Sequence, residues 1–273
     1  MHYQQYGFIQ NNGAQIYYES AGAGRPLVML HGHLLDNGQW DDQFAAWASH
    51  YQVIRYDARG FGQSTLPPVP FAYHEDLYAL LQHLGIAHTY LLGCSGGGAT
   101  IIDFAVTYPA MVEALILVGT GVSGYQPSGP PPPVMLAMME ARQRDEIDQA
   151  VECSLQALTD GPRRTPQQVN PVARERTRTM TARLFARPPV PEAVPQLLEP
   201  SAFSRLSTIT APTLVIIGAE DQAPLHEIAN LVTAQITGAQ KVIIPDAGHH
   251  PNLEQPELFN RLIHEFLSKV AAH

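Results

Sequence analysis

The sequence predicts an α/β fold in which a mostly parallel sheet is covered by helices on both faces. Short runs of aliphatic and β-branched residues recur along the chain, and stretches with the length and period of amphipathic helices lie between them. Strands that alternate with helices pair in parallel, because each crossover helix returns the chain to the same end of the sheet. The 273 residues suffice for one domain with a sizeable core.

Eight runs have the composition of strands, and five stretches between or after them have the pattern of helices. The expected strands are residues 7–10, 15–20, 27–30, 51–56, 89–92, 114–118, 213–217 and 241–244. The expected helices are residues 39–49, 72–84, 97–108, 225–232 and 257–270. Asn11-Asn12-Gly13 joins the first two strands, and Asn-Gly between extended runs is a strong hairpin signal. The eight-stranded sheet is therefore expected to begin with an antiparallel hairpin.

The alternation of strand and helix stops after residue 118 and resumes only at residue 213. Gly119-Thr120-Gly121 comes first, then prolines at positions 127 and 130–133, and a second proline-rich stretch (Pro188, Pro189, Pro191, Pro195) ends the interval. Residues 122–202 show helical patterns only. We expect them to form a helical cap inserted after the sixth strand, in a core domain made of residues 1–121 and 203–273.

Composition excludes several classes of partner. The formal net charge is -9 and no dense Lys/Arg tract exists, so the field of the whole protein repels nucleic acid. No apolar run approaches the roughly 18 residues of a membrane span. Residues 1–5 lack the pattern of a secretory leader, which makes a cytoplasmic protein the expectation.

Cys94 and Cys153 are isolated thiols, so a disulfide is not expected. The protein is expected to be a monomer or a homodimer.

A candidate nucleophile lies at the end of the fifth expected strand. Gly93-Cys94-Ser95-Gly96-Gly97 is a G-x-S-x-G motif between a strand and a helix. Small residues on either side of Ser95 permit a sharp, strained turn that raises the serine hydroxyl out of the sheet. The same turn leaves the Gly96 N–H free at a helix N-terminus, where an oxyanion would form.

Serine needs a base, and the base needs a carboxylate that fixes its tautomer. Glu220 and Asp221 follow the seventh expected strand, and His249 and His250 follow the eighth. The chain order serine, acid, histidine is the one that accompanies a nucleophile elbow. His31-Gly32-His33-Leu34 follows the third strand, and the backbone N–H of His33 would complete an oxyanion hole.

Taken together, these motifs resemble the α/β-hydrolase superfamily over nearly the whole chain. The resemblance rests on His31-Gly32, Asp57-x-Arg59-Gly60-x-Gly62-x-Ser64, the elbow at Ser95, Gly218-x-x-Asp221, and Gly248-His249 followed by Glu254-x-Pro256. It implies an α/β-hydrolase fold with Ser95 as nucleophile, His249 as base and Asp221 as orienting acid. It also implies that the amides of His33 and Gly96 form the oxyanion hole, that no cofactor is needed, and that residues 122–202 cover the site.

Departures from individual branches narrow the expected chemistry. The elbow carries Ser95 where haloalkane dehalogenases and epoxide hydrolases have aspartate, and Gly96 stands where dehalogenases and proline iminopeptidases have tryptophan. All eleven tyrosines lie at or before Tyr125, so the cap lacks the paired tyrosines of epoxide hydrolases. The remaining branch contains esterases, enol-lactonases, perhydrolases and C–C hydrolases.

We therefore expect an enzyme that cleaves an ester or lactone of a small, partly apolar molecule through an acyl-enzyme. Three alternatives stay open: a C–C hydrolase of ring-cleavage dienones that uses the same triad, a small-molecule receptor with little turnover, and a metal-dependent hydrolase, which a chelator would inhibit. In the cap, Met135, Met138, Met139 and Phe185 are expected to contact an apolar substrate.

Several other polar residues have a structural interpretation. Asp57, Arg59 and Ser64 are expected to stabilise their turn, Asp246 to be a loop residue, and Glu254 to fix the start of the last helix. The spacing of His31, His33 and Asp36 matches no metal motif, so no metal is expected. Five cap arginines span more than one helical face, so most are expected to be solvated. One of them is a candidate for binding a carboxylate of the substrate. These are Arg174, Arg176, Arg178, Arg183 and Arg187.

Overall fold

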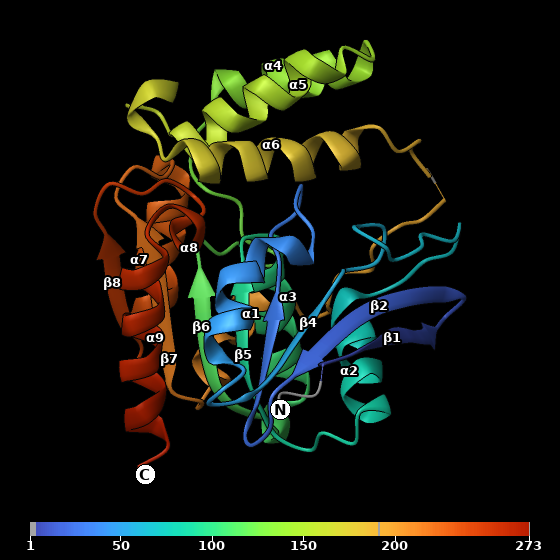
Figure 1. Cartoon of the computed structure of the whole chain (residues 1–273), viewed down its shortest axis with the longest axis vertical. Helices are drawn as coiled ribbons and strands as arrows, with labels where there is room; N and C mark the ends of the chain where they lie inside the picture. Colours follow the sequence, from blue (N-terminus) through green and yellow to red (C-terminus); the bar gives the residue numbers. More distant parts are fainter. Residues whose placement is uncertain (1–3, 191, 273) are drawn as a thin grey trace.

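The computed structural model describes residues 4–190 and 192–272. Two of the sequence features include residues outside the described ranges. Residues 1–3 belong to the segment without a leader pattern, and Pro191 belongs to the second proline-rich stretch. Eight strands form one sheet in the order β1-β2-β4-β3-β5-β6-β7-β8 (Figure 1). The strands are β1 (Gln4–Asn11), β2 (Ala14–Ala21), β3 (Pro26–Leu30), β4 (Gln52–Tyr56), β5 (Thr89–Cys94), β6 (Val112–Val118), β7 (Thr213–Gly218) and β8 (Gln240–Ile244). The predicted α/β fold and its eight-stranded sheet are confirmed.

The sheet begins with the predicted antiparallel hairpin. β1 and β2 pair antiparallel, and the turn between them places Asn12 and Gly13 at φ 41° and 74°. Positive φ at both central residues matches the right-handed twist of the flanking strands, and Asn and Gly adopt it at little cost. β2 also pairs antiparallel with β4, whereas the remaining neighbours are parallel.

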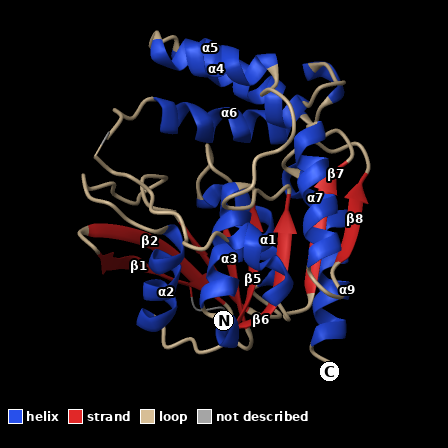
Figure 2. Cartoon of the chain, turned by 180° about the vertical axis from the view of Figure 1, so that it is seen from behind, coloured by secondary structure: helices blue, strands red, loops and turns tan. Residues whose placement is uncertain are grey.

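Each face of the sheet has its own hydrophobic core, because alternate residues of a strand point to opposite sides. On β3, Val28 and Leu30 belong to one core, and Leu27 and Met29 to the other. The first core lies under α2 (Tyr73–His83), α3 (Gly96–Thr107) and α7 (Ala223–Gln235). The second lies under α1 (Asp41–Trp47) and α9 (Pro256–Val270). Figures 1 and 2 show these two layers from opposite sides.

The segment between β6 and β7 lies above the carboxyl ends of the strands (Figure 1). It contains α4 (Pro133–Gln143), α5 (Ile147–Ser154), the π-helical turn η3 (Leu155–Asp160), η4 (Pro166–Gln168) and α6 (Pro171–Phe185). α6 faces the sheet, and α4 and α5 pack on its far side. The exact core and cap boundaries at residues 122 and 202 stay predictions. Within the described ranges, no helix has both the length and the apolarity needed to cross a bilayer.

The expectation that helices fill residues 122–202 is wrong for both ends of this segment, since residues 122–132 form no helix. The described residues between 186 and 201 form no helix and run back to the core, where Pro195 bridges to Phe71. Prolines lack a backbone N–H and clash with a preceding helical turn, so this proline-rich stretch does not continue α6.

A buried ion pair ties the first hairpin to α2. The Arg59 guanidinium donates through Nε to Asp76 Oδ2 at 2.8 Å and through Nη2 to Asp76 Oδ1 at 2.6 Å. It also donates to the carbonyl oxygens of Asn11 and Asn12 in the hairpin. Both side chains are almost fully buried, so each charge depends on the other for its compensation.

The rest of the turn after β4 is also structural, in agreement with the sequence interpretation. The Asp57 carboxylate accepts the backbone N–H groups of Asn37 at 2.8 Å and Gln63 at 2.7 Å. The Ser64 hydroxyl donates to the Asp57 carbonyl at 2.7 Å. Gly62 has φ 46°, and a Cβ there would lie 2.1 Å from the Asp57 carboxylate. The polar side chains of this motif therefore close a turn.

Asp76→Asn is expected to lower the free energy of unfolding by about 3–5 kcal/mol, because Arg59 stays buried without a counter-charge. The matched control is Glu113→Gln, whose partner Arg25 is half exposed and whose pair is worth about 1 kcal/mol or less. Urea denaturation at neutral pH measures both. Equal losses in the two variants would contradict the special role of the buried pair.

Candidate active site

Ser95 follows β5 directly and precedes α3 in a strained backbone conformation. Its φ is 53° and its ψ is -117°, which a residue with a side chain rarely adopts. The Ser95 amide donates to the Val118 carbonyl at 2.8 Å, which fixes the turn to the end of β6. Ser95 is half buried, and its hydroxyl makes no hydrogen bond to another residue in the described ranges. The hydroxyl is thus available to a ligand.

Asp221 and His249 form a buried pair at the ends of β7 and β8. His249 Nδ1 donates to Asp221 Oδ2 at 2.9 Å, and each residue is only 2% exposed. A carboxylate can only accept here, so the proton lies on Nδ1 and leaves Nε2 as the acceptor of the neutral ring. This tautomer is the one that a general base requires.

Glu220 and His250 are the sequence neighbours that could take the places of Asp221 and His249, and the structure puts both in different environments. Glu220 turns away and accepts from Arg163 Nε at 2.9 Å. His250 is 1% exposed, and neither of its ring nitrogens has a hydrogen-bond partner among the described residues. Burial lowers the pKa of His250 well below its usual range, so its ring is neutral. Asp221 and His249 are therefore the pair that the fold brings together.

Gly119 connects the serine turn with this pair. It follows Val118, the hydrogen-bond partner of Ser95, and a Cβ at Gly119 would lie 2.9 Å from His249 Nδ1. On the other side, the Sγ atom of Cys94 lies 3.9 Å from the His249 carbonyl oxygen. Ser95, Asp221 and His249 consequently share one edge of the sheet. Burial raises the pKa of the Cys94 thiol to about 12, so the thiol is protonated and is not itself a nucleophile.

The amides of Gly96 and His33 are both free to donate. Gly96 is the first residue of α3, so its N–H has no acceptor within the helix. No acceptor for the His33 N–H is found in residues 4–190 and 192–272 either. A Cβ at Gly96 would lie 2.5 Å from Cγ of His33. The His33 ring thus fills the space that a larger residue at position 96 would need, and the two residues lie in contact.

His33 carries no charge at neutral pH. Its ring stacks on Phe61 with centroids 5.3 Å apart. Although part of the residue is open to solvent, the protein atoms packed around the ring disfavour its charged form and lower its pKa to about 4.

His31, His33 and Asp36 do not converge on a common point for a metal ion. His31 is fully buried; Nδ1 donates to the Gly32 carbonyl at 2.8 Å, and Nε2 accepts from the Ala58 amide at 3.0 Å. Asp36 caps the short helix η1 (Asn37–Trp40) by accepting from Gly38. Desolvation lowers the pKa of His31 to about 4.

The π-helical turn η3 contacts the loops that carry Asp221 and His249, which sequence reasoning missed. The His249 amide donates to the Leu158 carbonyl at 2.9 Å. Next to Asp221, Gln222 Nε2 donates to the Ala157 carbonyl at 2.6 Å. π-helical turns are often found at functional sites. No local sequence signal indicates these contacts, because backbone carbonyls of a distant segment supply the acceptors.

Arg164 and Glu254 close the His249 loop, and sequence reasoning also missed this role. Arg164 donates to Glu254 Oε2 at 2.8 Å, and to the carbonyls of Thr159 at 2.6 Å and Asp246 at 3.0 Å. Glu254 also accepts the Gly248 amide at 2.7 Å. The expectation that Glu254 fixes the start of the last helix is wrong: it ends α8 (Pro251–Glu254), and its carboxylate reaches back to the loop. Asp246 lies in that loop, exposed, with φ 52°.

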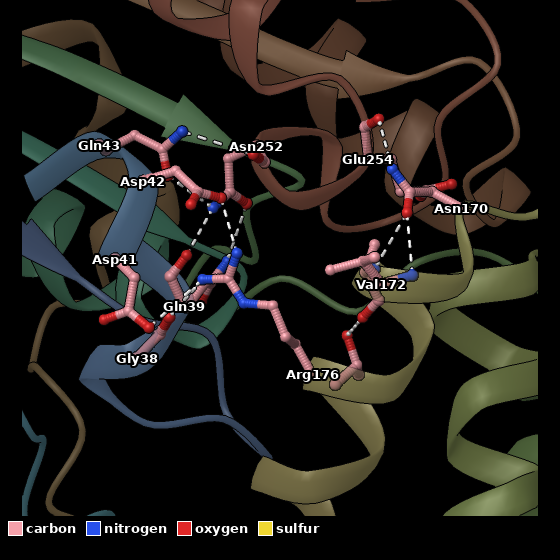
Figure 3. Close-up of polar contacts among 12 residues, drawn as sticks. Gly38, Gln39, Asp41, Asp42, Gln43, Asn170, Val172, Arg176, Asn252 and Glu254 are labelled. Atoms are coloured by element: carbon pink, nitrogen blue, oxygen red, sulfur yellow. Dashed lines mark hydrogen bonds and ion pairs between the residues drawn. The ribbon is translucent and has the colours of Figure 1, made fainter. Parts of the chain in front are cut away.

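A third link joins the His33 loop to the residues after His249. Gln39 Oε1 accepts the Gly32 amide at 2.8 Å, and the Gln39 carbonyl accepts from Asn252 Nδ2 at 2.8 Å. All of these groups are buried, and Figure 3 shows Gln39, Gln43 and Asn252 in contact. The candidate oxyanion amide and the candidate base are therefore held relative to each other.

The expectation that most of the five cap arginines are solvated is wrong, because all five are paired. Arg176 reaches from α6 to Asp42 at 2.6 Å and to the Gly38 carbonyl at 3.0 Å (Figure 3). Arg187 donates to the Gly60 carbonyl at 2.9 Å. Arg174 and Arg178 bind acids of the same segment, and Arg183 lies 3.7 Å from Asp36. The contacts of Arg176, Arg183 and Arg187 dock this part of the segment onto the core.

The apolar residues predicted to contact substrate occupy different environments. Met138 and Phe185 are buried in a cluster formed within residues 138–185, and Met135 and Leu34 each pack against that cluster. Met139 is 54% exposed. A cavity of about 260 Å³ lies elsewhere, between α6 and the turn after β4, lined in part by Asp57 and Arg187. Contact of the four residues with substrate stays a prediction.

Comparison with known proteins decides the family. A family model described as "Alpha/beta hydrolase family" matches residues 27–262. The chain belongs to this family. A 2-hydroxy-6-oxononadienedioate/2-hydroxy-6-oxononatrienedioate hydrolase of Burkholderia vietnamiensis is 29% identical, over 93% of this chain and 91% of the relative.

Two solved structures have the same fold at similar identity. One is Est816, described as an N-acyl homoserine lactone degrading enzyme, with a TM-score of 0.77, 27% identity, and coverage of 95% of this chain and 100% of that one. The other is a thermophilic esterase from Thermogutta terrifontis, with a TM-score of 0.77, 28% identity, and coverage of 97% and 99%. The relatives of this hydrolase are thus esterases, lactonases and C–C hydrolases.

Arg164→Ala is expected to loosen the His249 loop, because Glu254 loses its cation and the carbonyls of Thr159, Asp160 and Asp246 lose a donor. Hydrogen exchange of the Gly248 and His249 amides, followed by mass spectrometry, should quicken by about tenfold or more, equivalent to about 1.4 kcal/mol of local stability. Arg163→Ala is the matched control, since the exposed Arg163 side chain binds Glu220, in the loop that also carries Asp221. Unchanged exchange in Arg164→Ala would show that η3 alone holds the loop.

The contribution of His31 to stability is expected to disappear in acid. Its pKa is about 4 in the folded state and about 6.5 unfolded, so the unfolded chain binds more protons between these values and stability falls as pH falls. The difference in unfolding free energy between wild type and His31→Gln should shrink by about 3 kcal/mol from pH 7 to pH 4. Denaturant titrations at several pH values measure it, and a pH-independent difference would refute the assignment.

Proposed function

We propose that this hydrolase cleaves an ester or lactone of a small, partly apolar molecule through a covalent acyl-enzyme. The observation that carries the proposal is the position of Ser95, at φ 53° on a strained turn, at the sheet edge that also holds the Asp221–His249 pair at 2.9 Å. The resemblance to an esterase and to a lactone-degrading enzyme supports the same class of substrate.

In this mechanism Ser95 Oγ attacks the substrate carbonyl while His249 Nε2 takes its proton. Asp221 keeps the proton on Nδ1 and stabilises the imidazolium that forms. The amides of His33 and Gly96 donate to the oxyanion, and one such donor is typically worth about 10²–10³ in rate. The leaving group accepts the proton from His249, and a water molecule activated by His249 then releases the acid. The Ser95 hydroxyl makes no hydrogen bond to another described residue, and catalytic contacts commonly tighten on substrate binding.

The side chains of the cap favour binding of an uncharged substrate. Met135 and Leu34 each pack against its apolar cluster, and both are only partly buried. The five arginines of α6 and its end are already paired with protein groups. A carboxylate-bearing substrate would have to compete with these pairs, whereas an ester or lactone would not.

C–C bond hydrolysis is the second candidate, favoured by the 29% identity to a dienedioate hydrolase. It would need a cation for a substrate carboxylate, and Arg183 is the least committed of the five: it is 69% exposed at its side chain and lies 3.7 Å from Asp36. An Arg183→Gln variant that loses activity on dienones but keeps activity on esters would support this reaction. The receptor alternative has no observation in its favour.

The decisive experiment is intact mass after incubation with a small fluorophosphonate. Wild type should gain one adduct, Ser95→Ala none, and His249→Gln should react about 10²–10⁴-fold more slowly because it lacks the base. Ser123→Ala is the matched control, since that hydroxyl is bound to Asp103 at 2.8 Å away from the triad. Esters, lactones and dienones are then assayed as substrates. A folded wild type without any adduct would overturn the proposal.

A further inference from the structure

One group of potential metal ligands lies directly behind the nucleophile. Cys94, His249 and His250 each offer a ligand atom, and these atoms lie within 4.8 Å of one another. It is the one such set of three found in residues 4–190 and 192–272. All three side chains are buried, being 0%, 2% and 1% exposed.

His250 supplies an independent indication that something polar binds here. Both of its ring nitrogens are buried without a hydrogen-bond partner among the described residues. An unsatisfied buried polar group costs about 1–3 kcal/mol, so such groups in folded proteins commonly have a water or an ion as partner. The His250 ring lies edge-on to His249 with centroids 5.0 Å apart, so its free nitrogens adjoin the candidate base.

The donor set is chemically suited to a borderline divalent cation. Thiolate and imidazole are the ligands that zinc prefers, whereas magnesium and calcium prefer oxygen. In a tetrahedral zinc site the ligand atoms lie about 3.5 Å apart. The three atoms would therefore have to close in on the ion by on the order of 1 Å, which small side-chain rotations allow.

We propose that Cys94, His249 and His250 form an inhibitory binding site for zinc and similar cations. On binding, the Sγ–H bond of Cys94 breaks, its proton passes to the solvent, and the sulfur electron pair forms the bond to the metal. The two imidazoles bind as neutral rings, and no oxidation or reduction takes place.

The ion would disable the base whichever nitrogen of His249 it takes. Binding at Nδ1 moves the ring proton to Nε2 and displaces the hydrogen bond to Asp221, and binding at Nε2 removes the acceptor for the serine proton. The inhibitory effect rests on the proposed function of His249, whereas the binding itself does not. The two are therefore tested separately.

Binding is measured with Co²⁺ on the Ser95→Ala variant, which keeps all three ligands and needs no catalysis. One equivalent should bind and give a sulfur-to-cobalt charge-transfer band, and Cys94→Ala in the same background should lose the band. Loss of a partner outside the ligand shell costs about 10–100-fold in affinity, so loss of the ligand His250 in His250→Asn should weaken binding by about 100-fold or more. Cobalt bound without the sulfur band, or no binding, would overturn the site.

Inhibition is measured as the rate of Ser95 modification by the fluorophosphonate with and without ZnCl₂. Wild type should be protected reversibly, with recovery on adding EDTA, and Mg²⁺ should have no effect. Cys94→Ala and His250→Asn should react like wild type without zinc and resist it, whereas Cys153→Ser, the other free cysteine, should stay sensitive. Equal zinc sensitivity in Cys94→Ala would refute the proposal. If Ser95 is unreactive throughout, the cobalt spectrum still decides the binding site while the proposed function fails.

Discussion

Backbone packing above the sheet determines the rest of the site. At the ends of β7 and β8, a Cβ on Gly218 would lie 2.0 Å from the Gly248 carbonyl oxygen, and a Cβ on Gly248 would lie 2.6 Å from that of Thr159. Backbone atoms are therefore in direct contact among three segments: the loop that carries Asp221 (the acid loop), the loop that carries His249 (the histidine loop) and the π-helical turn η3. Because no side chain separates them, the Asp221–His249 distance is set by main-chain contacts.

Two kinds of interaction stabilise this stack. The carbonyls of η3 accept from Gln222 and from the His249 amide, and Arg164 joins Glu254 to several carbonyls beneath it. Arg164 and Glu254 are nearly buried, so their hydrogen bonds are shielded from water and hold the loop more firmly than a surface pair would. The histidine loop is thus supported by the inserted segment as much as by the strand that precedes it.

Sequence reasoning predicted what local patterns determine and missed what tertiary packing determines. The strands, the Asn-Gly hairpin and the turn at Ser95 follow from side-chain period and turn chemistry, which act over a few residues. The roles of Arg164, Gln222 and Gln39 depend on segments that meet only in the folded chain. For the same reason the exposure of the cap arginines could not be predicted. Their spacing shows that they lie on several faces of a helix, but it does not show that Asp42 and the Gly60 carbonyl of the core lie within hydrogen-bond reach.

The docking of α6 has a consequence for how a substrate would enter. α6 is tied to the core by Arg176, and by Arg187 just beyond its end, and η3 contacts the loops of Asp221 and His249, so α6 and η3 are fixed relative to the core. α4 and α5 contact one another and rest on α6 (Figure 1). An outward movement of the whole insertion would break the contacts that hold the loops of Asp221 and His249. An opening that preserves them would have to separate α4 and α5 from Phe185 of α6, with which they share one buried apolar cluster.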